Sequence, residues 1–269
     1  MIRSVGVIAV NTFKESVRDK VLYNLVVFAV LLIATSFLLG QLTAGQEVKI
    51  IKDLGLGATS IFGLFIAVFI GIGLVSKEVE RRSVYSLLAK PIRRQELVAG
   101  KYAGLLLTLL VNVAVMTVAT YVVLGYMSWT ESDQYKQAWE ASAVDPRMLK
   151  AIFLIFVELM IVTATALFFS TFSTPILSAV LTAGVWVIGH FNADLRNFDA
   201  IVDSRPAVYL ARALYYLLPN FAAFDVKAQV VHAQPVSAGY IAVTTSYGLV
   251  YVATLLVAAM FIFSRRDFK

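Results

Sequence analysis

The chain has 269 residues, of which 59% are hydrophobic and only 15% are charged. Soluble domains are roughly 45–50% apolar and about a quarter charged, so this composition indicates a protein that is solvated by lipid. The formal net charge is +6, but the basic residues lie between apolar blocks rather than in one patch, so nucleic acid is not an expected partner. The absence of cysteine excludes disulfides, thiolate nucleophiles and cysteine-ligated metals.

Six apolar blocks are long enough to cross a hydrocarbon layer of about 30 Å as helices. The sequence therefore predicts an all-α, polytopic membrane protein with a single transmembrane domain, residues 1–269. The first apolar block is too long for the core of a signal peptide, so we expect it to remain part of the protein. The six predicted spans are residues 21–42, 54–76, 102–127, 149–170, 175–191 and 241–263.

Lys and Arg are concentrated in the N-terminal segment, in the loop of residues 77–101 and after the last span. Summed over alternate segments, the side with the two termini and loop 77–101 has 14 basic residues and the other side has 9, and cytoplasmic segments are usually the richer ones. The distribution predicts that both termini and loop 77–101 are cytoplasmic.

Residues 1–20 predict an amphipathic helix, because apolar and polar side chains separate with a period near 3.6. Such a helix can lie in the cytoplasmic headgroup layer, or it can be a polar extension of the first span. Its predicted apolar face consists of Ile2, Val5, Ile8, Ala9, Thr12, Phe13 and Val17.

Loop 77–101 contains the pattern of a short helix flanked by charge. Ser83 is a plausible N-cap, and Val84, Leu87 and Leu88 form an apolar stripe. Pro91 ends the helix, because the residue before proline avoids the helical region. A helix of this kind lies on the membrane or docks in a groove of another protein. The simpler alternative is a positive-inside loop with no partner.

The extracytoplasmic segment of residues 192–239 is long and not very polar. Its stretch 206–219 is bounded by prolines and is apolar, but it is too short to span a bilayer. We expect either a partly re-entrant or interfacial helix, or a helix packed on the ends of the spans.

Catalytic motifs are not apparent in the sequence. Gly100-Lys101 lacks the other residues of a phosphate-binding loop, so ATP hydrolysis is not expected in this chain. The spacing of Gly100 and Gly104, like that of Ala67 and Gly71, is more typical of close helix packing than of a site. His190 and His232 do not have metal-ligand spacing, so we expect no metal site, and His190 is instead expected to form an interfacial polar cluster with Asn192 and Asp194. An intramembrane enzyme would need more than one acidic group within the spans.

Glu158 is the one charged residue predicted near the middle of a span. An ionised carboxylate there costs about 2.5–3.5 kcal/mol or more, so its side chain must face protein or water. Asn112 lies near the middle of another predicted span. These two residues either line a polar translocation path or form a structural hydrogen bond, and the sequence leaves both interpretations open.

The loop and the flanking spans resemble those of ABC-2 type permeases. In that family an acidic residue precedes a short helix, which is followed by a proline, basic residues and a Gly-Lys pair. Arg82-Ser83 replaces the family's usual Gly-Thr, and residues 214–225 further resemble a branch associated with multicopper-enzyme maturation. The matching residues are Glu80, Leu87, Leu88, Pro91, Arg93, Arg94, Gly100 and Lys101.

The resemblance implies an exporter that works by alternating access in the cytoplasmic membrane of a bacterium or archaeon. The permease would form a homodimer, with two copies of a separate ATPase that binds ATP and Mg. The alternative is an ATP-independent channel or secondary carrier, but the inverted repeats of such proteins are not evident. Residues 1–20 would be the connecting helix, and the ATPase contact would be made by Glu80, Ser83, Val84, Tyr85, Leu87, Leu88, Pro91, Arg93 and Arg94.

Overall fold

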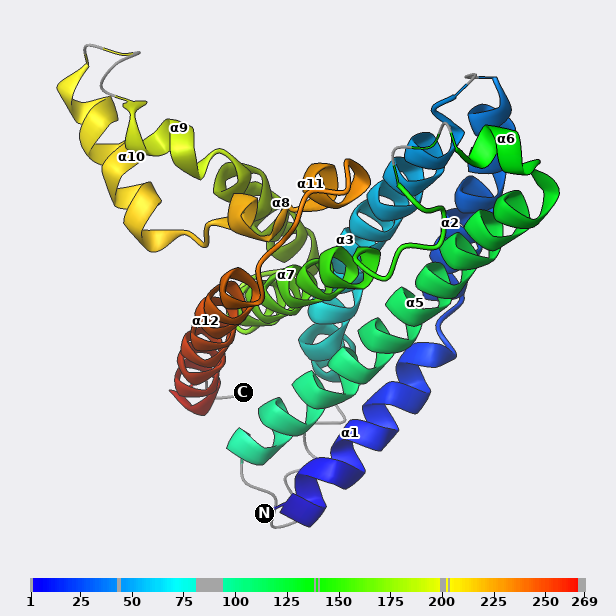
Figure 1. The fold of residues 1–269 in the computed structure, drawn as a ribbon. Helices are drawn as coiled ribbons and strands as arrows, with labels where there is room; N and C mark the ends of the chain where they lie inside the picture. Colours follow the sequence, from blue (N-terminus) through cyan, green and yellow to red (C-terminus); the bar gives the residue numbers. More distant parts are fainter. Residues whose placement is uncertain are drawn as a thin grey trace.

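The computed structural model describes residues 2–42, 45–80, 94–137, 139, 141–198, 202 and 204–265. The regular structure of these residues is helical, which confirms the all-α prediction (Figure 1). The longer helices are α1 (Ile2–Val17), α2 (Lys20–Gln41), α3 (Glu47–Glu80), α5 (Arg94–Thr130), α7 (Met148–Ser170), α8 (Pro175–His190) and α12 (Ala238–Arg265). The shorter ones are α6 (Asp133–Lys136), α9 (Asn192–Arg196), α10 (Arg205–Leu217) and α11 (Lys227–Val231).

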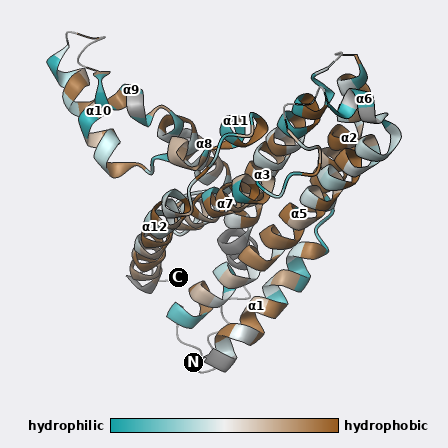
Figure 2. Ribbon diagram, viewed as in Figure 1, coloured by the Kyte–Doolittle hydropathy of each residue, from teal (hydrophilic) through white to brown (hydrophobic). Residues whose placement is uncertain are grey.

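Five helices in the described part of the chain are long and apolar enough to cross a membrane: α2, α3, α5, α7 and α12. Their apolar character is visible as brown ribbon in Figure 2. Each contains one of the predicted spans or coincides with it to within a residue. The protein is therefore an integral membrane protein.

Helix α8 is shorter than the other apolar helices. Its 16 residues correspond to about 24 Å, against a hydrocarbon thickness of about 30 Å. It begins at Pro175 and ends at His190, after which the polar helix α9 starts at Asn192. The predicted span at 175–191 is thus a real apolar helix, while the count of six spans stays a prediction.

Helix α7 is the centre of the bundle, with α3, α5, α8 and α12 packed around it. In the most apolar stretch of α7, 72% of the residues are buried, compared with 22% in the corresponding stretch of α12. A helix that is apolar on all sides belongs in a protein interior, and α7 has that composition. Most of its side chains, Glu158 among them, are buried by the surrounding helices, while Leu149 and Phe153 are exposed.

The predicted role of Gly100 and Gly104 in close helix packing is confirmed, because both glycines of α5 lie against α1. A Cβ atom at Gly104 would lie 2.5 Å from the Ala9 carbonyl oxygen, and one at Gly100 would lie 2.8 Å from the Ile8 Cβ. The predicted apolar face of α1 is therefore pressed against α5. Whether α1 also contacts lipid headgroups stays a prediction.

Gly71 allows an equally close contact between α3 and α7. A Cβ at this position would lie 2.5 Å from the Ala166 Cβ and 3.1 Å from the Thr163 carbonyl oxygen. We expect Gly71→Ala to destabilise the protein by about 1–3 kcal/mol, because the two helices must separate. Gly57→Ala in the same helix is the control, since the space around Gly57 is open. Equal melting temperatures for the two purified variants would contradict this contact.

The predicted short helix of loop 77–101 lies outside the described residues, together with Ser83, Val84, Tyr85, Leu87, Leu88, Pro91 and Arg93. Glu80 is the last residue of α3, and Arg94 is the first residue of α5. The start of α5 lies on the same side of the molecule as the beginning of α1 and the end of α12 (Figure 1).

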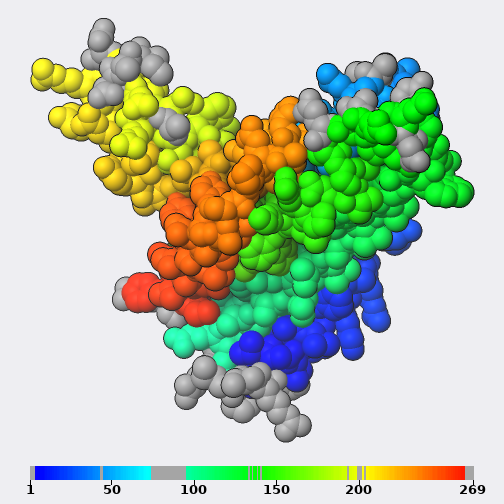
Figure 3. Space-filling model, in the orientation of Figure 1, coloured from blue at the N-terminus to red at the C-terminus, as the bar shows by residue number. Residues whose placement is uncertain are grey.

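Residues 219–236, which we call the strap, connect α10 to α12. The strap consists of a single 3-10 turn at Phe221–Phe224, helix α11 and irregular backbone. It packs against α3, α7 and α8, with Phe221 and Phe224 completely buried. Helices α9 and α10 project from the body of the molecule, as the yellow atoms of Figure 3 show. In segment 192–239 the part packed between the spans is thus the strap and not residues 206–219.

Candidate functional site

Glu158 lies about halfway along α7, and its side chain is only 2% exposed. The indole Nε1–H of Trp186, on α8, donates a hydrogen bond of 2.7 Å to Glu158 Oε1. An indole N–H is a donor only, so it suits a carboxylate well. The structure therefore places this acid in the protein interior with a polar partner, as the cost of a lipid-facing charge requires.

His190, one turn after Trp186 on α8, also lies beside the Glu158 carboxyl group. Its Nε2 lies 3.6 Å from Glu158 Oε1, and its ring centroid lies 4.4 Å from that of Trp186. Its Nδ1 lies 2.9 Å from the Trp186 carbonyl oxygen. A carbonyl oxygen can only accept, so Nδ1 carries the hydrogen of this bond and Nε2 faces the carboxylate.

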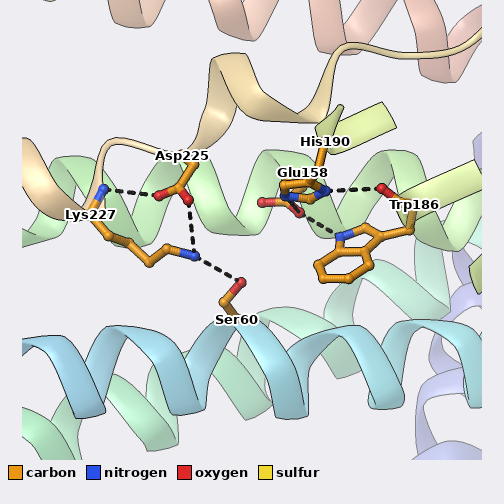
Figure 4. A network of polar contacts seen from close by, with 6 residues as sticks. All are labelled: Ser60, Glu158, Trp186, His190, Asp225 and Lys227. Atoms are coloured by element: carbon orange, nitrogen blue, oxygen red, sulfur yellow. Dashed lines mark hydrogen bonds and ion pairs between the residues drawn. The ribbon is translucent and has the colours of Figure 1, made fainter. Parts of the chain in front are cut away.

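The strap carries a second group of polar contacts, which is more exposed than the first (Figure 4). Lys227 Nζ lies 3.5 Å from Asp225 Oδ2 and 3.5 Å from the Ser60 hydroxyl of α3. The Lys227 and Asp225 side chains are 25% and 39% exposed, while Glu158 is buried. Phe221 stacks on His190 with ring centroids 5.8 Å apart, so the strap contacts the Glu158 group directly.

Side chains of α7 and α12 bond the irregular backbone of the strap and of the residues leading into it. Irregular backbone at membrane depth needs such partners, because lipid provides none. The tyrosine ladder consists of Tyr240 bonded to the Ala223 carbonyl, Tyr247 to the Asn220 N–H and Tyr251 to the Leu217 carbonyl. The cation clamp consists of Arg147 donating to the Ala233 carbonyl and Lys150 donating to the Val236 carbonyl.

The predicted site residues are not all brought together. Asn112 is half-buried on α5, and among the described residues it does not bond Glu158. Glu80 and Arg94 stand at the two ends of the undescribed part of loop 77–101. The roles proposed from sequence for these residues stay predictions.

Several polar residues around Glu158 were not identified from the sequence. Trp186 and His190 are four residues apart, so they share one face of α8, and this spacing was the available signal. The sequence instead suggested a polar cluster of His190 with Asn192 and Asp194. In the structure the Asn192 amide donates to the Tyr215 carbonyl oxygen at 3.4 Å, away from Glu158.

The arrangement provides a buried carboxyl group in an aromatic and polar setting, and the strap that packs on it also carries a partly exposed ion pair. Within the described part of the chain, no group of three or more His, Asp or Glu side chains is placed to hold a metal ion. The groups present can accept and donate hydrogen bonds to a polar solute or to water. This chemistry suits passage or gating better than bond cleavage.

Comparison with known protein families matches residues 7–268 to the family described as ABC-2 family transporter protein. No curated protein matches the chain. The family match covers nearly the whole chain, including the central helix α7, the strap and the segment of residues 81–93. The chain thus belongs to the ABC-2 transporter family and is the membrane-spanning permease component of an ABC transporter.

Proposed function

We propose that this permease is an exporter subunit that works by alternating access and is driven by a separate ATPase. It would act as a homodimer with two ATPase copies, each binding ATP and Mg, in the cytoplasmic membrane of a bacterium or archaeon. The observation that carries the proposal is the projection of α3 and α5 towards the segment that resembles a coupling helix.

The lengths of these two helices support an extension beyond the bilayer. Helix α3 has 34 residues and α5 has 37, which correspond to about 50 and 55 Å. The hydrocarbon layer is only about 30 Å thick. The intervening segment would thus be presented to the cytoplasm, where an ATPase groove could receive Leu87 and Leu88.

Movement of that segment would be transmitted through packed helices. Helix α1 lies against α5, and both α3 and α5 contact the central helix α7. A tilt of α3 and α5 would therefore change the surroundings of Glu158. ATP must bind the outward-facing state more tightly than the inward-facing one, because a ligand shifts an equilibrium only through such a difference.

Glu158 and Asn112 are proposed to line the translocation path. For Glu158 the support is its position on the central helix and its polar partners Trp186 and His190 on α8. For Asn112 the support is its place on α5, which packs against α7.

Single cysteines test the orientation that this function requires. We expect cysteines at Ser4 and Lys269 to react with an impermeant thiol reagent only from the cytoplasmic side, because the basic segments are predicted there. Cysteines at Ser132 and Ser237 should react from outside. The chain has no cysteine of its own, so each thiol reports one position. Labelling at either terminus from outside would refute the arrangement and the proposed docking of a cytoplasmic ATPase.

A further inference from the structure

We propose that the strap is a releasable cover over the buried polar groups around Glu158, and that its release opens the permease on the side opposite the chain termini. The inference rests on the proposed function, because alternating access requires an opening on that side. Its test below reads the position of the strap without any ATPase.

The strap reaches deep into the helix bundle. Phe221 stacks on His190, whose ring faces Glu158, and Glu158 lies about 15 Å along α7 from Met148. Lys227 reaches Ser60, about 20 Å along α3 from its first residue. The strap therefore fills the space between helices down to the middle of the bundle, and does not merely lie over their ends.

The polar attachments of the strap are of a kind that water can replace, whereas its buried Phe221 and Phe224 side chains hold it in the docked position. The tyrosine ladder and the cation clamp are bonds from side chains to backbone, while a spanning helix satisfies its backbone internally. Tyr240 and Asp225 are exposed enough for water to compete for their partners. Lifting the strap would exchange these bonds for bonds to water and leave the spans intact.

The docked strap also contains an unfavourable backbone conformation. Ala233 has a φ angle of 55°, in the left-handed region that L-residues with a side chain seldom adopt. The guanidinium of Arg147 bonds the carbonyl of this same residue. This conformation ends α11, because the Gln234 N–H donates to the Gln229 carbonyl oxygen and the Ala233 N–H donates to the Val230 carbonyl oxygen. It is internal to the strap and does not depend on the clamp.

The strap contacts α8 at Gly189. A Cβ at Gly189 would lie 2.5 Å from the Pro219 carbonyl oxygen and 2.6 Å from the Phe221 ring. Even an alanine would push the start of the strap away, because one of the opposing atoms is backbone. Gly184 on the same helix has open space around it, so it provides a matched control.

Accessibility of Ser60 measures whether the strap is docked. Ser60 is buried and faces Lys227 of the strap. In the cysteine-free chain, Ser60→Cys introduces the only thiol, which we would label with an impermeant maleimide in the full-length protein in lipid nanodiscs, where both faces are reachable. We expect slow labelling, accelerated about tenfold or more when Gly189→Ala is added and unchanged when Gly184→Ala is added.

Tyr240→Phe provides a second variant that does not introduce a clash. It removes only the hydroxyl that bonds the Ala223 carbonyl, so we expect labelling to rise about threefold. Unchanged labelling in both Gly189→Ala and Tyr240→Phe would overturn the proposal. Equal acceleration by Gly184→Ala would overturn it as well. ATPase activity is absent from this assay, so a failure of the proposed ATP-driven function would leave the labelling result standing.

Discussion

Replacement of Glu158 by glutamine is expected to lower ATP-driven transport at least about tenfold while the protein assembles normally. The amide oxygen of glutamine can still accept the hydrogen bond from Trp186, so the packing of α7 against α8 should persist. What disappears is the ionisable carboxyl group that faces His190. Transport and transport-coupled ATP hydrolysis in proteoliposomes are the measurements.

Comparison of Glu158→Leu with Glu158→Gln separates the role of the ionisable group from that of the hydrogen bond, because glutamine keeps the acceptor and leucine does not. Leucine leaves the Trp186 N–H without its acceptor, so we expect a loss of stability of about 0.5–2 kcal/mol in addition to the loss of transport. A purely structural Glu158 would give a nearly silent glutamine variant and a destabilised leucine variant. Transport at the wild-type rate by the leucine variant would remove Glu158 from the mechanism, and with it the reason for placing Asn112 beside the path.

The double substitution Leu87→Asp and Leu88→Asp is expected to release the ATPase. The two leucines belong to the apolar stripe of the short helix that the sequence predicts between charged residues, and such anchors usually carry most of the energy of an interface. Loss of two anchors at about 2 kcal/mol each would weaken binding by roughly a thousandfold. Co-purification of the ATPase and its stimulation by the permease are the readouts.

Ser86→Asp with Ala89→Asp is the matched control. At helical spacing these residues lie on the face opposite Leu87 and Leu88, so they add the same two charges away from the apolar stripe. We expect the control to keep its ATPase and the spans of both variants to remain folded. If the leucine variant co-purifies with a fully stimulated ATPase, the coupling role is refuted.

The membrane helices could be predicted closely from sequence, because long apolar runs have few other ways to satisfy their backbone. The predicted span 149–170 and helix α7 (Met148–Ser170) differ by one residue. Gly100 and Gly104 could be assigned to packing because small residues four apart allow close approach on a helix. Both are local signals, which a sequence displays directly.

The strap and its contacts could not be predicted in this way. Phe221 and Phe224 are buried by helices that are distant in the sequence, and the irregular backbone on either side of their short 3-10 turn has no periodicity to recognise. The tyrosines at 240, 247 and 251 lie on one face of α12. Their partners are backbone groups, and the pattern of side chains in a sequence does not show which backbone groups will be bonded. The burial of Glu158 was expected from its cost in lipid, whereas the choice of Trp186 and His190 as partners depends on how α8 packs.

If a separate ATPase drives this permease, the two proteins form one complex in the membrane, and the composition of that complex can be measured. The full-length chain, tagged and purified in mild detergent from the membranes where it is made, would be weighed intact by native mass spectrometry. The account predicts two copies of this chain with two copies of an ATPase that contains a phosphate-binding loop. Transport-competent protein recovered with no nucleotide-hydrolysing partner would contradict it.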